Sequence, residues 1–163
     1  QALPGIGVSY PVIFIIGSKP GEEDDHTGKA FTGPPGDYLK KWLKAIGYSL
    51  DKDCFSAYLV RCRPPNNRAP RADEIKTCLP YLEKQIHLLK PKIILALGEI
   101  TAQVLTGKKN ISLAELRGKE NIYQHIPLVV TYDPGSVLQD PGLRKPVWED
   151  LKYLKQLLEK VRR

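Results

Sequence analysis

The fold is decided by the stretch Pro11-Val-Ile-Phe-Ile-Ile-Gly-Ser-Lys-Pro-Gly21. Residues 12–16 are too few for a helix and rich in β-branched side chains, so they predict a strand buried on both faces. The following Gly-Ser-Lys-Pro-Gly predicts a tight, rigid turn, because glycine permits close backbone approach and proline fixes φ. In open α/β sheets ligands bind beyond the carboxyl ends of the strands, so this turn is the first candidate for a functional site.

Strand and helix patterns alternate along the rest of the chain. Apolar, β-branched runs predict three more strands, at residues 54–60, 92–98 and 126–132. Apolar residues at helical spacing predict three helices, at residues 38–46, 73–89 and 147–161. Asp37 is the expected N-cap of the first helix, and Pro80 is expected to start or kink the second. This alternation predicts a three-layer α/β/α sandwich around a mostly parallel four-stranded sheet, in a single domain over residues 1–163.

Composition sets broad limits on function. The 163 residues include 25 Lys and Arg against 18 Asp and Glu, for a net charge of +7. A basic balance is compatible with nucleic-acid binding, and a merely solvated basic surface is the alternative. No apolar run approaches the ~18 residues of a membrane span and nothing resembles a signal peptide, so no membrane contact and a cytoplasmic location are expected. A first residue of Gln suits a domain cut from a longer protein.

Five short motifs then occur in order: Gly17-x-x-Pro-Gly21, Gly28-x-x-Phe31-x-Gly33, Arg61-Cys-Arg-Pro-Pro65 with Asn67-Arg68, Ala96-Leu-Gly98 and Thr131-Tyr-x-Pro134. Together, over residues 11–155, they resemble the iron–sulfur uracil-DNA glycosylases of family 4. The resemblance implies an enzyme that flips a nucleotide out of the duplex and hydrolyses the bond between uracil and deoxyribose. It also implies a carboxylate that positions water, an aromatic ring that stacks on the base, an Asn that reads uracil and a His that stabilises developing negative charge.

The chain departs from this pattern at several of the implied catalytic positions. Ser18 stands where the family has its catalytic Glu, and a later acidic residue of the same motif corresponds to Asp24. Phe31 matches the stacking aromatic, with plain core packing as the alternative. Tyr58 replaces the Asn, and its bulk is expected to occupy space that a base needs. Asp133 replaces the His, where a negative charge is expected to repel the developing oxyanion; an ordinary turn-starting Asp is the alternative.

The cysteines give a parallel indication about the cofactor. The resemblance implies a [4Fe–4S] cluster on four Cys thiolates, two of them from a CxxC pair before the first strand. Cys62 and Cys78 match the later two positions, whereas residues 1–10 contain no Cys and Cys54 is expected to be a core residue. No cluster and no other metal is therefore expected, unless an N-terminal extension supplies ligands, and the two cysteines are interpreted as remnants.

Groups expected to face DNA are better retained than the catalytic groups. Basic and turn residues form the candidate phosphate contacts: Gly17, Lys19, Pro20, Gly21, Arg61, Arg63, Arg68 and Gly98. The loop after the fourth strand matches the family segment that wedges an apolar side chain into the duplex, here Val137 or Leu138, with loop anchoring as the alternative. DNA, and replication or repair proteins, are the expected partners.

Three hypotheses follow from these patterns. The first is a catalytically inactive uracil-DNA glycosylase-like module that binds DNA or docks within a larger repair or replication protein. The second is an active DNA glycosylase that excises uracil or another damaged base, with Asp24 or Asp133 as the replacement carboxylate. The third is a protein-interaction domain without DNA contact. The first is favoured because the positions of Glu, Asn and His all carry residues of different chemistry.

Overall fold

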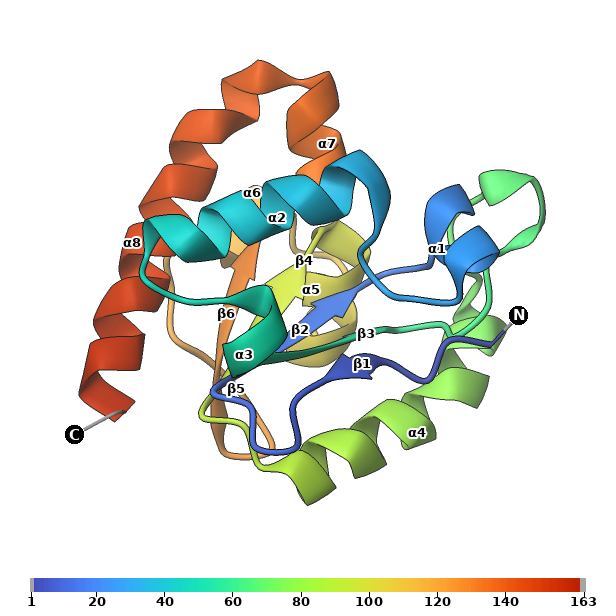
Figure 1. Ribbon diagram of the computed structural model, residues 1–163, viewed down its shortest axis with the longest axis horizontal. Helices are drawn as coiled ribbons and strands as arrows, with labels where there is room; N and C mark the ends of the chain where they lie inside the picture. The colour runs from blue at the N-terminus through green and yellow to red at the C-terminus, as the bar shows by residue number, and fades with distance from the viewer. Residues whose placement is uncertain (1, 162–163) are drawn as a thin grey trace.

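One sheet of six strands forms the centre of the molecule (Figure 1). The structure, a computed structural model, describes residues 2–161. Along the sheet the order is β1-β3-β2-β4-β6-β5. The bounds are β1 (Ile6–Gly7), β2 (Ile13–Gly17), β3 (Cys54–Tyr58), β4 (Ile93–Leu97), β5 (Asn121–Tyr123) and β6 (Ile126–Thr131). The predicted parallel core of four strands is confirmed as β3-β2-β4-β6, and antiparallel β1 and β5 are added at its edges.

Helices cover both faces of the sheet and make the predicted three layers (Figure 1). One face packs against α2 (Gly33–Ala45), α7 (Pro134–Gln139) and α8 (Arg144–Val161). The other face packs against α4 (Ala72–Leu89), α5 (Glu99–Thr106) and α6 (Leu113–Leu116). The remaining short elements are α1 (Glu22–Thr27), α3 (Leu50–Asp53), η1 (Pro65–Asn67) and η2 (Pro141–Leu143).

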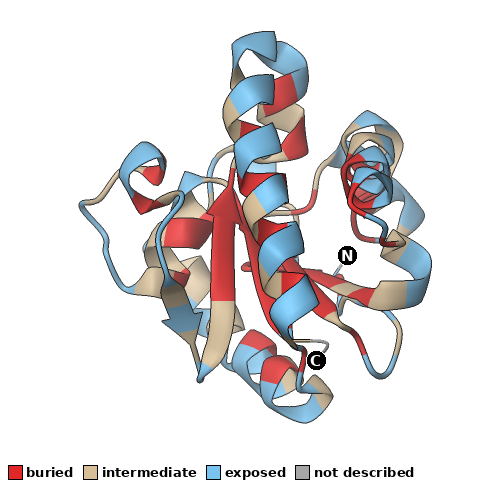
Figure 2. Ribbon diagram, turned by 90° about the vertical axis from the view of Figure 1, so that its left-hand side faces the viewer, coloured by how far each residue is buried: buried red, intermediate tan, exposed pale blue. Residues whose placement is uncertain are grey.

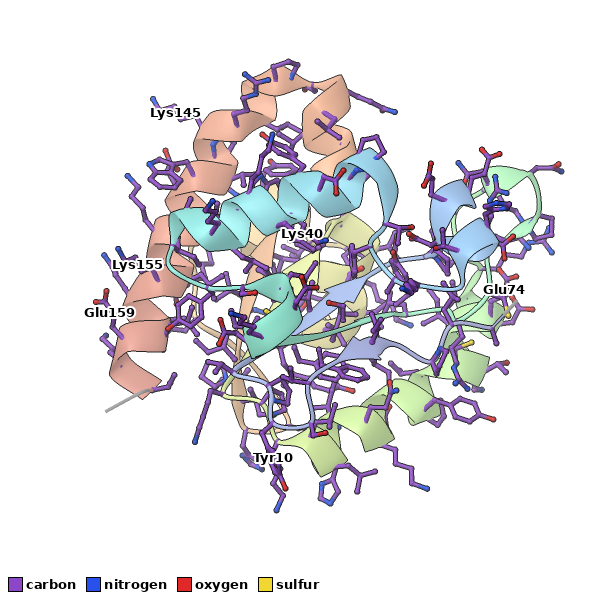
Figure 3. All side chains as sticks on the ribbon, in the orientation of Figure 1. Tyr10, Lys40, Glu74, Lys145, Lys155 and Glu159 are labelled. Carbon is purple, nitrogen blue, oxygen red and sulfur yellow. The ribbon has the colours of Figure 1, made fainter. Side chains whose placement is uncertain are left out.

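Strand β2 shows why this sequence needs two helical layers. Ile13 and Ile15 belong to the core beneath α2 and α8, whereas Phe14 and Ile16 belong to the core beneath α4 and α5. Figure 2 shows the strands buried throughout their central part and the helices exposed on their outer sides. On α8 the charged side chains of Lys155 and Glu159 point away from the sheet (Figure 3). Among residues 2–161, no helix has the length and apolar composition that crossing a bilayer requires.

One helix boundary differs from the predicted one, and one predicted helix contains its proline. Helix α2 begins at Gly33 with Thr32 as its N-cap, and Asp37 lies exposed inside the helix. The prolines at 34 and 35 explain the earlier start, because proline suits the first helical turn, where its missing N–H costs nothing. Helix α4 continues through Pro80. The apolar stripe that includes Leu82 and Ile86 packs on the sheet, and this tertiary packing outweighs the local penalty of the proline.

The sheet brings four strand ends to one edge. Gly17 at the end of β2 pairs with Tyr58 at the end of β3, and Leu97 at the end of β4 pairs with Thr131 at the end of β6. From β2 the chain goes first to β3 on one side and then to β4 on the other. The connections therefore diverge between β2 and β4, and such a switch point is where open α/β sheets bind their ligands.

A buried carboxylate on α8 joins that helix to the end of β6 and to Arg117 after α6. The Asp150 carboxylate accepts hydrogen bonds from Arg117 Nε at 2.8 Å and from Thr131 Oγ1 at 2.5 Å. Burial raises the pKa of Asp150 above its ordinary value, although both hydrogen bonds oppose that rise. The Arg117 guanidinium also lies 5.5 Å from the centre of the Tyr132 ring. These contacts fix the residues immediately before Asp133.

Candidate active site

A cleft of about 580 Å³ lies where the parallel strands end. Its floor includes Gly17 of β2 and Leu97 of β4. The turn after β2, the start of α1, the segment before α2 and the start of α7 form its walls. Several residues singled out from the sequence line it together: Gly17, Ser18, Lys19, Gly21, Asp24, Phe31, Tyr58 and Asp133.

Asp24 is buried in the cleft wall, with only 5% of its surface exposed. Its Oδ1 accepts hydrogen bonds from Thr32 N at 2.8 Å and from Thr32 Oγ1 at 2.6 Å. Its Oδ2 accepts from Gly21 N at 3.1 Å and from the Tyr58 hydroxyl. Each carboxylate oxygen therefore already has two donors, and Asp24 serves to hold the wall together rather than to activate water.

Tyr58 covers one face of Phe31. The two ring centroids are 4.8 Å apart and the ring planes are inclined by 27°. The Phe31 N–H donates to the Tyr58 hydroxyl oxygen at 2.9 Å. Burial, together with the hydrogen bond to Asp24, raises the pKa of Tyr58 well above its ordinary value, so the phenol stays protonated and donates to that carboxylate. A Cβ at Gly17 would lie 2.9 Å from Tyr58 Cε1 and 3.0 Å from Phe31 Cζ, so both rings require glycine there.

Asp133 caps α7 and borders the cleft. Its Oδ2 accepts from Ser136 N at 3.1 Å, and its Oδ1 accepts from Ser136 Oγ at 2.6 Å. It is only partly buried, and these are the only donors to its carboxylate among the hydrogen bonds of the described residues. Gly98 beside it has a φ of +92°, which favours glycine, and a Cβ there would make only an ordinary contact with Asp133 Oδ1, at 3.7 Å. The side chain is thus fixed in position and still has lone pairs available.

The profile of the uracil DNA glycosylase superfamily matches residues 4–157. The chain belongs to that superfamily.

Relatives within the superfamily match nearly the whole chain. A type-4 uracil-DNA glycosylase of Saccharolobus solfataricus is 42% identical over 165 residues, covering 97% of this chain and 76% of that protein. The type-4 enzyme of Sulfurisphaera tokodaii is 38% identical, covering 96% of this chain and 74% of that protein. The one from Pyrobaculum aerophilum is 39% identical, covering 93% of this chain and 80% of that protein.

These relatives correct the favoured sequence-based hypothesis. A catalytically inactive module was predicted because Ser18, Tyr58 and Asp133 depart from the family pattern. That prediction is wrong, since relatives that match nearly the full chain are enzymes by name and point to an enzyme here. Replacement of individual family residues does not show that a site has lost its chemistry. The cleft still presents a fixed carboxylate at Asp133.

Lys19 fastens the loop after β3 to the turn after β2. Its ammonium donates to the Asn67 carbonyl oxygen, to Asn67 Oδ1 at 3.2 Å and to the Arg68 carbonyl oxygen at 3.1 Å. Burial and the nearby Arg63 lower the pKa of Lys19, and Asp133 opposes that shift. Lys19 therefore has a structural role at the rim of the cleft as well as a charge that a phosphate can meet.

The three predicted phosphate-binding arginines differ in the contacts that their guanidinium groups already make within the protein. Arg68 makes a two-pronged ion pair with Glu74, with N–O distances of 2.7 and 3.0 Å. Arg61 lies 4.8 Å above the centre of the Tyr81 ring. Arg63 is partly buried, and its Nε has no hydrogen-bond partner among the described residues. Arg61 and Arg63 are thus more available to a phosphate than Arg68.

The ion pair of Glu74 with Arg68 makes the stability of the protein depend on pH in the acidic range. Figure 3 places Glu74 beside the loop that follows β3. The hydrogen bond from Arg68 lowers the pKa of Glu74 from 4.5 to about 2. A carboxyl group whose pKa is lowered by folding stabilises the folded state at every pH above its pKa in the unfolded chain. This contribution is lost as the pH falls toward the folded-state pKa of about 2. Glu74→Gln is therefore expected to flatten the dependence of the free energy of unfolding on pH between about 4.5 and 2, as urea titrations can measure.

The exposed Glu83 on the same helix offers the matched control. Glu83→Gln is expected to leave the slope near that of the original protein. An unchanged slope in the Glu74→Gln variant would show that the ion pair with Arg68 contributes nothing in solution.

Four of the predicted DNA contacts are not available in the structure. The N–H of Gly21 donates to Asp24, and the N–H of Gly98 donates to the Thr131 carbonyl oxygen at 2.8 Å. Neither amide is free for a phosphate. Val137 is 1% exposed because it packs in the core, whereas Leu138 is 45% exposed. Of the two predicted wedge residues, Leu138 is therefore the exposed one. Pro20 is buried like Val137.

The cysteines do not form a four-thiolate site within the described chain. Cys62 is exposed after β3, Cys78 is partly buried on α4, and Cys54 is buried in the core as predicted. Among residues 2–161, no group of three or more His, Cys, Asp or Glu side chains is placed to hold a metal ion. The residues present therefore do not fit a [4Fe–4S] cluster by themselves. That the protein carries no cluster stays a prediction, which iron analysis and visible absorbance test.

From the sequence, no role was assigned to three residues of the cleft. Thr32 donates two hydrogen bonds to Asp24, Asn67 accepts from Lys19, and Ser136 fixes Asp133. Only Ser136 carried a usable signal, since an Asp three residues before it has the spacing of a helix N-cap. The contacts of Thr32 and Asn67 join segments that are separated in the chain, and no local pattern indicates them.

Proposed function

We propose that this chain is a DNA glycosylase that hydrolyses the N-glycosidic bond of uracil or another damaged base. The relatives named as uracil-DNA glycosylases support the reaction class. The observation that carries the proposal is Asp133, a carboxylate fixed by α7 at the cleft where the parallel strands end. Hydrolysis of a nucleoside needs such a charge close to the sugar and a pocket for the base beside it.

Asp133 suits the catalytic role better than the other carboxylates of the cleft. Both carboxylate oxygens of Asp24 are already occupied by hydrogen bonds from Thr32, Gly21 and Tyr58. Glu22 and Glu23 are exposed on α1 at the rim. Among residues 2–161, the hydrogen bonds to the Asp133 carboxylate come from Ser136 only, and the side chain is partly buried, which strengthens its electrostatic effect on a bound sugar.

The reaction proposed for Asp133 is a hydrolysis. The bond between C1′ and the base nitrogen breaks, and the base leaves with the electron pair. The carboxylate stabilises the positive charge that develops on the sugar, and it accepts a proton from the water whose oxygen forms the new bond to C1′. The departing base takes up a proton from solvent. The hydroxyl of Ser18, which also lines the cleft, is proposed to orient that water.

DNA is accordingly the proposed partner. Arg61 and Arg63, together with Lys19, are proposed to contact phosphates around the cleft, and Leu138 to fill the gap left by the flipped nucleotide. Action on the chromosome in the cytoplasm, alongside other repair or replication proteins, is part of the same proposal.

The direct test uses duplex oligonucleotides that carry a single deoxyuridine or deoxyinosine. Removal of the base leaves an abasic site, and alkali then cuts the strand there, which a denaturing gel resolves. Cleavage at the modified position is expected, and the matched strand with thymidine should stay intact. Intact strands for every modified base, at protein concentrations that saturate the DNA, would refute the proposal.

A further inference from the structure

We infer that Tyr58 is the residue that determines which base the cleft accepts. The inference rests on the proposed glycosylase function and adds the basis of its specificity. It comes from the way the Tyr58 side chain fills the aromatic end of the cleft.

Phe31 offers a base its ring face and its backbone N–H, and Tyr58 already occupies both. A flipped base binds by stacking on an aromatic face and by hydrogen bonds to its edge. The Tyr58 ring is stacked on Phe31 at 4.8 Å, and the Tyr58 oxygen accepts the Phe31 N–H at 2.9 Å. The phenol thus stands where the ring and the carbonyl oxygen of a bound pyrimidine would otherwise lie.

Tyr58 is held too firmly to move aside for a base. It is 6% exposed, and its hydroxyl donates to the buried carboxylate of Asp24. Displacing the ring would leave Asp24 without one of its donors and Phe31 without an acceptor, and both losses are costly in a buried site. The ring also rests on Gly17, where no side chain separates it from the strand. Tyr58 therefore remains as a wall when the substrate binds.

The base must then bind in the remaining part of the cleft, between this wall and Asp133. The polar side chains that line the cleft include the hydroxyl of Ser18 and the amides of Asn67 and Gln139. Hydroxyl and amide groups both donate and accept, so they can adapt to different base edges. A site without a dedicated donor and acceptor pair rejects analogues only weakly. Tyr58 therefore gives the enzyme broad specificity for deaminated bases rather than selectivity for uracil.

Replacing Tyr58 by Asn tests this directly. The variant uncovers Phe31, frees its N–H and adds an amide that matches the donor and acceptor of the uracil edge. Single-turnover rates would be measured on duplexes carrying deoxyuridine or deoxyinosine. The original protein is expected to act on both at rates within about tenfold, and Tyr58→Asn to raise the ratio of uracil to hypoxanthine release by about tenfold or more.

Two further variants make the result unambiguous. Tyr58→Gln brings the same amide on a longer side chain that reaches Asp24, so it is expected to shift the ratio in the same direction if the Asn variant unfolds. Tyr48→Asn removes another buried tyrosine outside the cleft, and it should leave the ratio unchanged. Thermal melting shows which variants are folded. A ratio that stays constant in folded Tyr58 variants, while both rates fall together, would overturn the inference.

Binding separates this inference from the proposed function. If the original protein releases no base, fluorescence polarisation can compare DNA that carries 2′-fluoro-2′-deoxyuridine, whose glycosidic bond resists cleavage, with DNA that carries a tetrahydrofuran abasic site. Tyr58→Asn is expected to increase the preference for the uracil-bearing strand by about tenfold. Equal preferences in the two proteins would contradict the role of Tyr58 whether or not the cleft is catalytic.

Discussion

Replacing Asp133 with Asn is expected to lower the rate of base release by about 10² to 10³-fold. Asparagine keeps an acceptor for Ser136 N, and it is as good an N-cap as aspartate, so α7 should stay in place. The variant loses the negative charge that stabilises the sugar and accepts the proton of water. Single-turnover kinetics on the best modified oligonucleotide, with DNA affinity measured in parallel, give the rate of the chemical step.

Asp140 provides the matched control for this variant. It caps η2 through a hydrogen bond from Gly142 N at 3.0 Å, but it is exposed and does not line the cleft. Asp140→Asn should therefore keep the original rate. If Asp133→Asn also keeps it, another group supplies the charge and the catalytic assignment fails.

Replacing Asp24 with Ala is expected to lower the free energy of unfolding by about 3–5 kcal/mol. The carboxylate joins the turn after β2, the segment before α2 and the end of β3 through Gly21, Thr32 and Tyr58. Alanine would leave the buried hydroxyl of Tyr58 and the N–H groups of the other two without an acceptor. Unfolding in guanidinium chloride, followed by circular dichroism, measures the loss.

The exposed Asp37 on α2 is the control for the loss of an aspartate. Asp37→Ala is expected to change the free energy of unfolding by no more than about 0.5 kcal/mol. A similarly small change for Asp24→Ala would mean that its hydrogen bonds exchange readily with water, and the rigid wall described for the cleft would not exist.

Much of the fold could be predicted because the four central strands are mostly apolar runs. Residues 12–16 and 92–98 leave no alternative to a buried strand, and the intervening helices show their apolar stripes plainly. The edge strands β1 and β5 have only two and three residues, too few for any period to show. The acidic run that forms α1 has no apolar stripe either; its helix is supported by acidic residues in the first turn and by the bond from Gly21 to Asp24.

The place of the site could also be predicted, but not the state of its groups. The turn at Gly17 and the ends of the other parallel strands had to meet at one edge of the sheet. All the acceptor positions of Asp24 are occupied by hydrogen-bond donors, whereas Asp133 keeps lone pairs available. This difference depends on donors from separate segments, since Tyr58 lies 34 residues beyond Asp24. The sequence showed which family residues were replaced, and that alone led to the wrong prediction of an inactive protein.

The most direct test of the proposed function is chromatographic detection of the free base released from modified DNA by the purified protein. The cleft with Asp133 predicts that uracil appears in solution in amounts equal to the abasic sites formed, and that the Asp133→Asn protein releases far less in the same time. DNA that is bound but yields no free base, from any deaminated substrate, would contradict it.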